Sequence, residues 1–213
     1  MKKIGSGFLI VFLLLFIPFS LGQGAEPKNV ILVIGDGMGP QVVGLAVYYN
    51  LFMNGPGKPL NMERMMATGN TGYCLTYQYG TVATDSASAA TALASGVKTR
   101  DAIIGKDHDG RTMKAITDVA LQGKKSVGVI SNTRMTHATP AAFYAHVVHR
   151  DMENEIASQL IERGDVHVAF SGGAQHFIPE GIKVEEHPDL KRISKAAGWG
   201  SSRRKDKRDL IYE

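Results

Sequence analysis

The chain has 213 residues, of which 44% are hydrophobic and 21% are charged, with 24 glycines, 8 prolines and one cysteine. This composition excludes a collagen-like, a disulfide-stabilised or an intrinsically disordered protein. The formal net charge of +4 is local, because basic residues gather at positions 2–3 and within 203–208. We interpret the basic segment 203–208 as a solvated loop and expect no nucleic-acid-binding surface.

The first 25 residues differ from the rest of the chain. Two lysines precede an almost continuous apolar run, 8–21, and the small residues Gly22, Gly24 and Ala25 follow it. The run is too short and too near the N-terminus for a convincing membrane span, so the pattern predicts a signal peptide over 1–25. A retained membrane anchor is the alternative. We expect a secreted or periplasmic protein without a stable membrane span once the leader is removed.

The remaining 188 residues suffice for one domain with a sizeable core, and short β-branched runs alternate in them with helix-like segments. We expect strands at 29–35, 69–76, 126–131 and 166–171, and helices at 40–49, from residue 60 onward, and at 84–95, 113–121, 140–146 and 151–161. The unbroken run at 29–35 is typical of a strand buried on both faces. The alternation predicts an α/β fold with a doubly wound, mostly parallel sheet and helices on both faces.

Three local patterns give further expectations. Met62, Met65 and Met66 recur at helical spacing and are expected to fill the core. Cys74 lies in an apolar stretch and is expected to be a small core residue, with no cysteine partner in the chain. The segment 102–113 predicts a hairpin with a turn at 107–110, since it lacks the ligand pattern of a calcium loop.

Polar residues cluster at the expected carboxyl ends of strands, where open α/β sheets bind their ligands. The clusters are Asp36 after the first strand, the segment 84–86, and the segment 132–140. The glycines around Asp36 do not form a dinucleotide fingerprint, because Pro40 stands where the third glycine belongs. A carboxylate flanked by glycines lets a bulky charged ligand approach the backbone, which favours a metal–phosphate site.

Ser86 stands at the start of an expected helix, where free N–H groups and the helix dipole favour a phosphate or an alkoxide. No GxSxG motif surrounds it, so metal-assisted attack on phosphorus is favoured over acyl transfer. The structural alternative is that Thr84 or Asp85 caps the helix and the alanines that follow pack on the sheet.

His137 and Arg150 each have two interpretations. His137 is either a satisfied structural histidine or a metal ligand. Arg150 either caps a helix or pairs with Glu153, or its planar guanidinium grips a phosphate. Since the chain has no Cys-His spacing, any metal must be held by oxygen and imidazole groups.

Several ordered motifs together carry a family resemblance. They are NVILVIGDGMG, TDSASAATALASG, SNTRMTHATPAAFYAH, SGGAQHFIPEG and the closing RRKDKRDLIYE. With these motifs the chain resembles the N-terminal part of a secreted bacterial alkaline phosphatase, from about Lys28 to its end. The resemblance implies that 26–213 is the N-terminal part of an alkaline phosphatase-like catalytic domain.

The resemblance also implies catalytic roles. Ser86 would take the phosphoryl group and be dephosphorylated later by water. Arg150 would hold the non-bridging phosphate oxygens, and Asp85 would orient Arg150. The implied substrates are small phosphomonoesters with little selectivity for the leaving alcohol, and the resemblance allows a homodimer.

The implied cofactors are two Zn²⁺ ions and one Mg²⁺ ion. Asp36 would bridge a zinc ion, which Ser86 also faces, and the magnesium ion. Thr139 would bind magnesium directly, and His137 would contact it through water. The remaining zinc ligands of the family have no counterpart among the seven histidines of this sequence.

We therefore expect these 213 residues alone to have negligible phosphatase activity. The alternative from another functional class is a truncated, non-catalytic remnant that binds phosphate or Mg²⁺ at most. A relative of the cofactor-independent phosphomutases is a third interpretation, which the predicted signal peptide disfavours.

Overall fold

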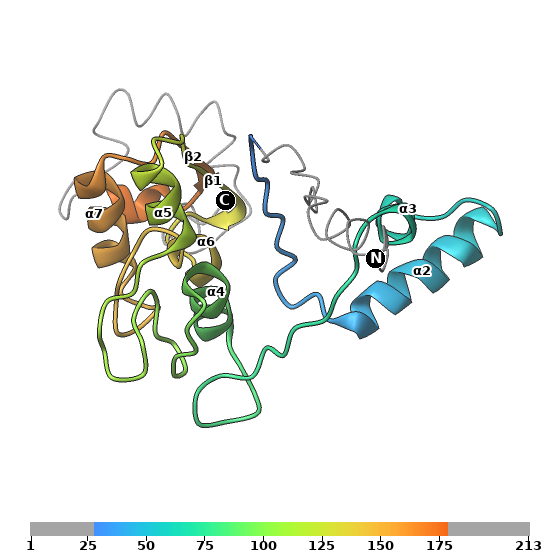
Figure 1. Cartoon of the computed structure of the whole chain (residues 1–213), viewed down its shortest axis with the longest axis horizontal. Helices are drawn as coiled ribbons and strands as arrows, with labels where there is room; N and C mark the ends of the chain where they lie inside the picture. The colour runs from blue at the N-terminus through green and yellow to red at the C-terminus, as the bar shows by residue number, and fades with distance from the viewer. Residues whose placement is uncertain (1–27, 179–213) are drawn as a thin grey trace, which may run out of the picture. The chain divides into compact units, whose positions relative to one another are not determined.

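The computed structural model describes residues 28–178 (Figure 1). Its elements, in chain order, are α2 (Pro40–Asn54), α3 (Asn61–Thr68), α4 (Ser86–Ser95), α5 (Ile116–Gln122), β1 (Gly128–Arg134), α6 (Ala138–Ala141), α7 (Glu153–Arg163), β2 (Val168–Gly172) and the 3-10 helix η1 (Ala174–Phe177). The predicted leader and the basic segment 203–208 lie outside the described residues.

The chain divides into two units, with the boundary between Gly35 and Asp36. The described part of the first unit, 28–35, has no regular secondary structure. The side chains of Ile31 and Val33 are 88% and 87% exposed. The prediction of a buried strand over 29–35 is therefore wrong in this structure. A β-branched run forms a buried strand only when neighbouring strands pair with it, and the described strand pairing is that of β1 with β2.

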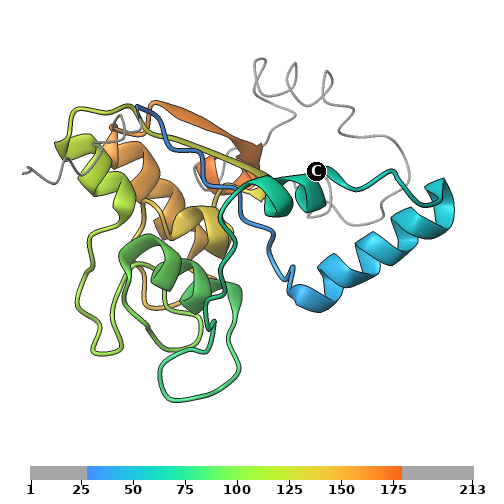
Figure 2. The ribbon, with the colours of Figure 1, turned by 45° about the vertical axis from the view of Figure 1, so that its right-hand side comes forward.

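The second unit has an α/β fold, as predicted. Strands β1 and β2 pair in parallel, with Val129 opposite Ala169. Parallel strands need a crossover connection, which α6 and α7 supply between β1 and β2. Among the described residues the sheet has these two strands. Figure 2 shows them side by side, with α4 to α7 gathered next to them.

Helix α4 forms much of the core because its residues are small. Ala87, Ala90 and Ala94 are at most 4% exposed, and the helix packs closely against α6. The helix ends at Gly96, whose φ of 76° is the left-handed conformation that glycine adopts without strain. Larger buried side chains complete this core, including Ile104, Tyr144 and Ile156.

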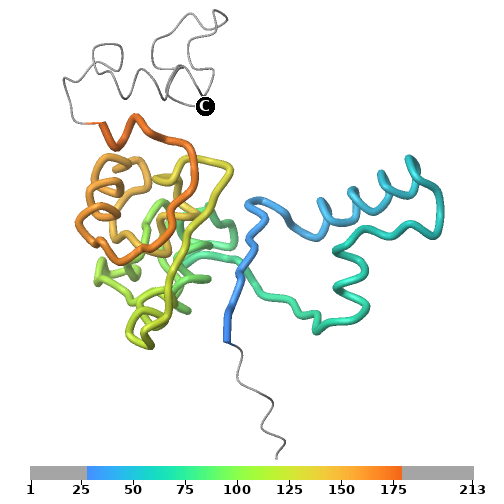
Figure 3. Tube along the Cα trace, turned by 90° about the horizontal axis from the view of Figure 1, so that it is seen from above, coloured from blue at the N-terminus to red at the C-terminus, as the bar shows by residue number. Residues whose placement is uncertain are grey.

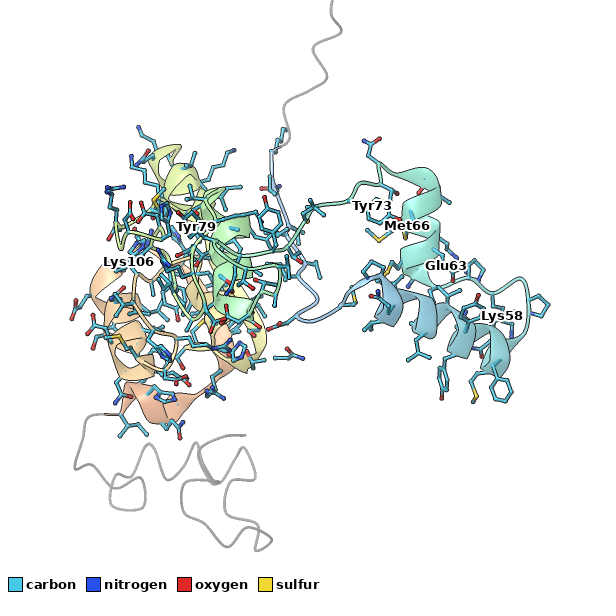
Figure 4. All side chains as sticks on the ribbon, turned by 90° about the horizontal axis from the view of Figure 1, so that it is seen from below. Lys58, Glu63, Met66, Tyr73, Tyr79 and Lys106 are labelled. Atoms are coloured by element: carbon cyan, nitrogen blue, oxygen red, sulfur yellow. The ribbon has the colours of Figure 1, made fainter. Side chains whose placement is uncertain are left out.

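Helices α2 and α3 confirm the predicted helices at 40–49 and from residue 60, and α2 extends to Asn54. Figure 3 follows the chain from α2 into α3. The prediction that the methionines fill a core is wrong, since Met65 and Met66 are 72% and 46% exposed. Figure 4 labels Met66 on α3. Helical spacing identifies the face that a helix could bury. Among the described residues, no element covers the face of α3 that carries Met65 and Met66.

The segment after α3 also differs from expectation. Residues 69–76 form no strand, and Cys74 is exposed rather than buried. The side chain of Lys98 donates hydrogen bonds to the carbonyl oxygens of Leu75 and Tyr77 at 3.0 and 2.5 Å. The Lys98 ammonium group thus satisfies two carbonyl groups of this irregular segment.

The predicted turn at 107–110 is confirmed. Lys106 and Thr112 form an antiparallel bridge, and Asp107 Oδ1 accepts hydrogen bonds from the backbone N–H groups of Asp109 and Arg111. This carboxylate serves the turn, as an Asx residue commonly does. None of the helices between residues 28 and 178 has both the length and the apolar character needed to cross a bilayer.

Candidate active site

The carboxylate of Asp36 joins three segments that are far apart in the sequence. It lies in the turn before α2, where Gly37 has a φ of 68° that favours glycine. Its Oδ1 accepts a hydrogen bond of 2.8 Å from Ser86 Oγ, and its Oδ2 accepts one of 2.8 Å from Thr139 Oγ1. The structure therefore brings these three predicted site residues together.

Asp36 is held in its ionised form. Partial burial raises the pKa of its carboxyl group, but the hydrogen bonds from Thr139 and Ser86, with the electrostatic effect of the nearby His137 and Arg150 side chains, outweigh that effect and lower the pKa. The carboxylate is thus an acceptor and a candidate metal ligand, and it is a weak base near neutral pH.

Asp85 has both of the roles that the sequence left open. As the N-cap of α4, its Oδ1 accepts hydrogen bonds from the backbone N–H and the hydroxyl of Ser88, at 2.9 and 2.7 Å. Its other oxygen accepts a hydrogen bond of 3.0 Å from Arg150 Nη1. Burial raises the pKa of Asp85, but these hydrogen bonds lower it overall. Asp85 is therefore a fixed, charged support for Arg150.

Arg150 also contacts His137, with 3.0 Å between Arg150 Nη2 and His137 Nε2. A guanidinium group cannot accept, so His137 Nε2 is the acceptor and its proton lies on Nδ1. Burial and the charge of Arg150 lower the pKa of His137, although Asp36 opposes them. The alternative pairing of Arg150 with Glu153 is wrong, since Glu153 binds Arg134 instead.

The other imidazole nitrogen of His137 points to a polar ligand. His137 Nδ1 is buried, has no hydrogen-bond partner, and lies 3.9 Å from Asp36 Oδ2. Buried polar atoms are usually satisfied, so this one needs an explanation. Since this nitrogen carries the proton, the missing partner is an acceptor beside Asp36, such as a water or an anionic ligand oxygen.

The donor groups fit the two proposed metals unequally. Mg²⁺ prefers oxygen ligands and keeps several waters, and the Asp36 carboxylate with the Thr139 hydroxyl suits it. A catalytic zinc ion takes three protein ligands. The described residues do not gather three His, Cys, Asp or Glu side chains in one metal-binding group. They fit Mg²⁺, and by themselves they do not complete a zinc site.

Sequence reasoning missed two residues that support this site. Gln78 is 7% exposed, and its Oε1 lies 2.8 Å from Ser88 Oγ. Ser88, three residues after Asp85, is the N-cap partner that the spacing could have revealed. Gln78 gave no signal, because it reaches the site only through the folding of an irregular segment.

Comparisons with known proteins identify a family for this chain. A family model described as alkaline phosphatase matches residues 27–213. Alkaline phosphatase 4 of Bacillus subtilis is 36% identical over 163 residues, which are 72% of this chain and 34% of that protein. The repressible alkaline phosphatase of Saccharomyces cerevisiae is 32% identical over 97% of this chain and 36% of that protein.

Solved structures of alkaline phosphatases are also similar to this chain. The alkaline phosphatase of the Antarctic bacterium TAB5 matches with a TM-score of 0.62 and 35% identity, over 80% of this chain and 46% of that one. A histidine-to-glutamate variant of the TAB5 enzyme has Mg bound in its M3 site. The Thermus thermophilus enzyme matches with a TM-score of 0.63 and 30% identity, over 78% of this chain and 34% of that one.

The chain spans about a third of the length of these two curated relatives, 34% and 36%. The matched segment includes every residue of the candidate site, from Asp36 to Arg150. With its α/β fold, parallel strands and family match over 27–213, the chain belongs to the alkaline phosphatase family.

Proposed function

We propose that this chain provides the nucleophile and the phosphate grip of a metal-dependent phosphomonoesterase that acts through a phosphoserine on Ser86. The observation that carries the proposal is the connected set of contacts that links Ser86, Asp36 and Thr139 to His137, Arg150 and Asp85. Membership of the alkaline phosphatase family supports the same reaction class.

Ser86 is the nucleophile in the proposed reaction. Its oxygen attacks phosphorus, so that the Ser86 Oγ–P bond forms while the bond from phosphorus to the leaving oxygen breaks, and the proton lost by the Ser86 hydroxyl is balanced by the proton that the leaving alcohol gains. Water then attacks the phosphoserine, releases inorganic phosphate and returns the Ser86 hydroxyl. The hydrogen bond from Ser86 Oγ to Asp36 Oδ1 orients the nucleophile before the reaction.

Arg150 holds the transferred group. Its guanidinium is always charged, and its planar donors suit two oxygens of one phosphate. Asp85 fixes one end of the guanidinium through the 3.0 Å hydrogen bond. Since only the phosphate would be held by these residues, the leaving alcohol is free to vary. Small phosphomonoesters are therefore the proposed substrate class.

Asp36, Thr139 and, through water, His137 are the proposed holders of Mg²⁺. When bound, the ion would offset negative charge on the Asp36 side of the phosphate. The Mg-bound state of the TAB5 variant supports this choice of ion. For zinc, we propose Asp36 and Ser86 as partial ligands. We also propose that the leader over 1–25 directs the protein to a secreted or periplasmic location.

Hydrolysis of p-nitrophenyl phosphate with Zn²⁺ and Mg²⁺ supplied tests this proposal. We expect the low turnover of these 213 residues to be lost in Ser86→Ala and retained in the control Ser95→Ala, whose hydroxyl donates to Thr91 O within the same helix. Measurable turnover that is equal in the native protein and in Ser86→Ala would rule out Ser86 as the nucleophile.

A second candidate function is binding of phosphate or Mg²⁺ without turnover. It is favoured by one observation, that the described residues do not complete a three-ligand metal group. Calorimetric titration with inorganic phosphate separates the two. A folded protein that binds phosphate through Arg150 and releases no p-nitrophenol with both metals present would support this second function.

A further inference from the structure

The carboxylate of Glu153 is the centre of a polar cluster that borders the candidate site. Glu153 is the first residue of α7, and its side chain is 15% exposed. Arg134 binds it with two hydrogen bonds, Nε to Oε2 at 2.8 Å and Nη2 to Oε1 at 2.7 Å. Thr136 Oγ1 donates to Oε2 at 2.5 Å, and His176 Nε2 lies 3.0 Å from the same oxygen.

The cluster lies directly beside two proposed magnesium holders. Arg134 ends β1, and Thr136, which is fully buried, precedes His137 in the chain. Thr139 follows two residues after His137, and its hydroxyl donates a hydrogen bond to Asp36. Glu153 therefore fixes both residues that lead into the segment carrying His137 and Thr139.

Other contacts hold the backbone of this segment, whereas the side chain of Thr136 is held by its hydrogen bond to Glu153. The N–H of Met135 donates to Gly172 O at 3.0 Å, and Tyr144 Oη donates to Met135 O at 2.7 Å. Gly173 approaches so closely that an added Cβ would lie 2.8 Å from the Cβ of Arg134. The side chain of Arg134 is thus confined on one face and bound by Glu153 at its end.

We infer that Glu153 is a positioning residue, which holds the segment 134–139 so that His137 and Thr139 face Asp36. This inference rests on the proposed function, because it concerns the same magnesium-holding residues. It assigns Glu153 no contact with substrate or metal. Groups that orient metal-binding residues without touching the ion commonly change metal affinity by about 10- to 100-fold when they are replaced.

The test replaces Glu153 and compares it with two matched controls. Glu153→Gln keeps the shape of the side chain and removes its charge. Glu155→Gln makes the same charge change in the same helical turn, where the Glu155 carboxylate contacts Gln159 on the surface. Ile156→Val removes one methyl group from the buried face of α7 and changes no polar group of the cluster. Glu153→Asp keeps the charge and is used if Glu153→Gln does not fold.

Two measurements on the full chain decide the outcome. Backbone hydrogen exchange of 134–139 reports order in the segment, and calorimetry with Mg²⁺ alone reports its affinity. We expect Glu153→Gln to increase exchange in this segment and to weaken Mg²⁺ binding by about tenfold or more. We expect both controls to retain the native values, and Glu153→Asp to retain more of the Mg²⁺ affinity than Glu153→Gln.

The inference is overturned if Glu153→Gln exchanges and binds Mg²⁺ like Glu155→Gln, or if Ile156→Val has the same effects as Glu153→Gln. Increased exchange with unchanged Mg²⁺ affinity would also overturn it. If the native chain neither binds Mg²⁺ nor releases p-nitrophenol, the proposed function fails separately. The exchange of 134–139 then decides the positioning role alone.

Discussion

At the scale of single residues, the candidate site is organised around two ionised carboxylates with different partners. Asp36 accepts from hydroxyl groups, which are weak acids and can be displaced by a metal ion. Asp85 accepts from a helix N-terminus and a guanidinium, which are permanent partners. The first carboxylate is therefore open to a ligand, whereas the second is committed to holding Arg150.

Replacing Arg150 tests this division of roles. We expect Arg150→Ala to weaken the binding of inorganic phosphate by roughly 10- to 100-fold, because charge-assisted hydrogen bonds contribute about 1.5–3 kcal/mol. The melting temperature should fall little, since the Ser88 contacts still hold Asp85. Phosphate titration and thermal unfolding measure the two effects, with Arg111→Ala on the exposed turn as control. A large loss of stability with unchanged phosphate affinity would contradict the assignment.

At the scale of elements, α4 combines a fixed start with a fixed end. Asp85 caps its N-terminus, and Gly96 ends it with a φ of 76°. Its buried face consists of small residues, so the helix lies close to α6, which carries Thr139. A displacement of α4 would therefore move Ser86 relative to Thr139 and Asp36.

The helix end can be tested without changing any packing. An added Cβ at Gly96 would meet no atom within 4 Å, so Gly96→Ala changes the backbone preference alone. We expect it to lower the free energy of unfolding by about 1–2 kcal/mol. Gly72→Ala is the control, because Gly72 has open space and no positive φ. Equal urea midpoints for the two variants would argue against a left-handed Gly96.

Helices α5 and α7 are joined by an ion pair between Asp118 and Arg163. Partial burial raises the pKa of Asp118, but the hydrogen bonds from Arg163 and from the Ala115 N–H lower it below 3.8. A lowered folded-state pKa contributes stability above the unfolded value, and that stability is lost as the pH falls through the folded value.

Replacing Asp118 therefore has a pH-dependent effect. We expect Asp118→Asn to be less stable than the native protein at neutral pH, and the difference to shrink as the pH falls below 3.8. Thermal unfolding across a pH series measures it, with the exposed Asp101→Asn as control. A difference that stays constant down to the lowest pH would show that the ion pair contributes nothing through ionisation.

Across the whole molecule, local sequence signals such as helix caps predicted helices correctly, whereas apolar patterns did not predict which residues are buried. The N-cap at Asp85, the glycine at 96 and the small residues between them are properties of one helix, so the sequence was sufficient to predict α4. Burial of 29–35, Met65 or Cys74 depends on what covers them, and an apolar pattern does not identify its partner.

The same distinction applies to the site. Asp36, Ser86 and Thr139 could be proposed because each stood in a polar cluster within a recognisable motif, and the structure brings them within hydrogen-bond distance. The role of Glu153 could not be predicted in this way. Its partners, Arg134 and Thr136, lie 19 and 17 residues away and meet it only when α7 packs beside the end of β1.

The proposed function depends on transfer of the phosphoryl group to Ser86. It is tested most directly by incubating the protein with Zn²⁺, Mg²⁺ and a phosphomonoester, quenching in acid and locating phosphate by peptide mass spectrometry. We expect one phosphoserine, at Ser86, that is absent from Ser86→Ala and reduced in Arg150→Ala. Phosphate on another residue, or release of the alcohol at the native rate by Ser86→Ala, would contradict it. A folded, metal-loaded protein that never becomes phosphorylated would contradict it as well and favour binding without turnover.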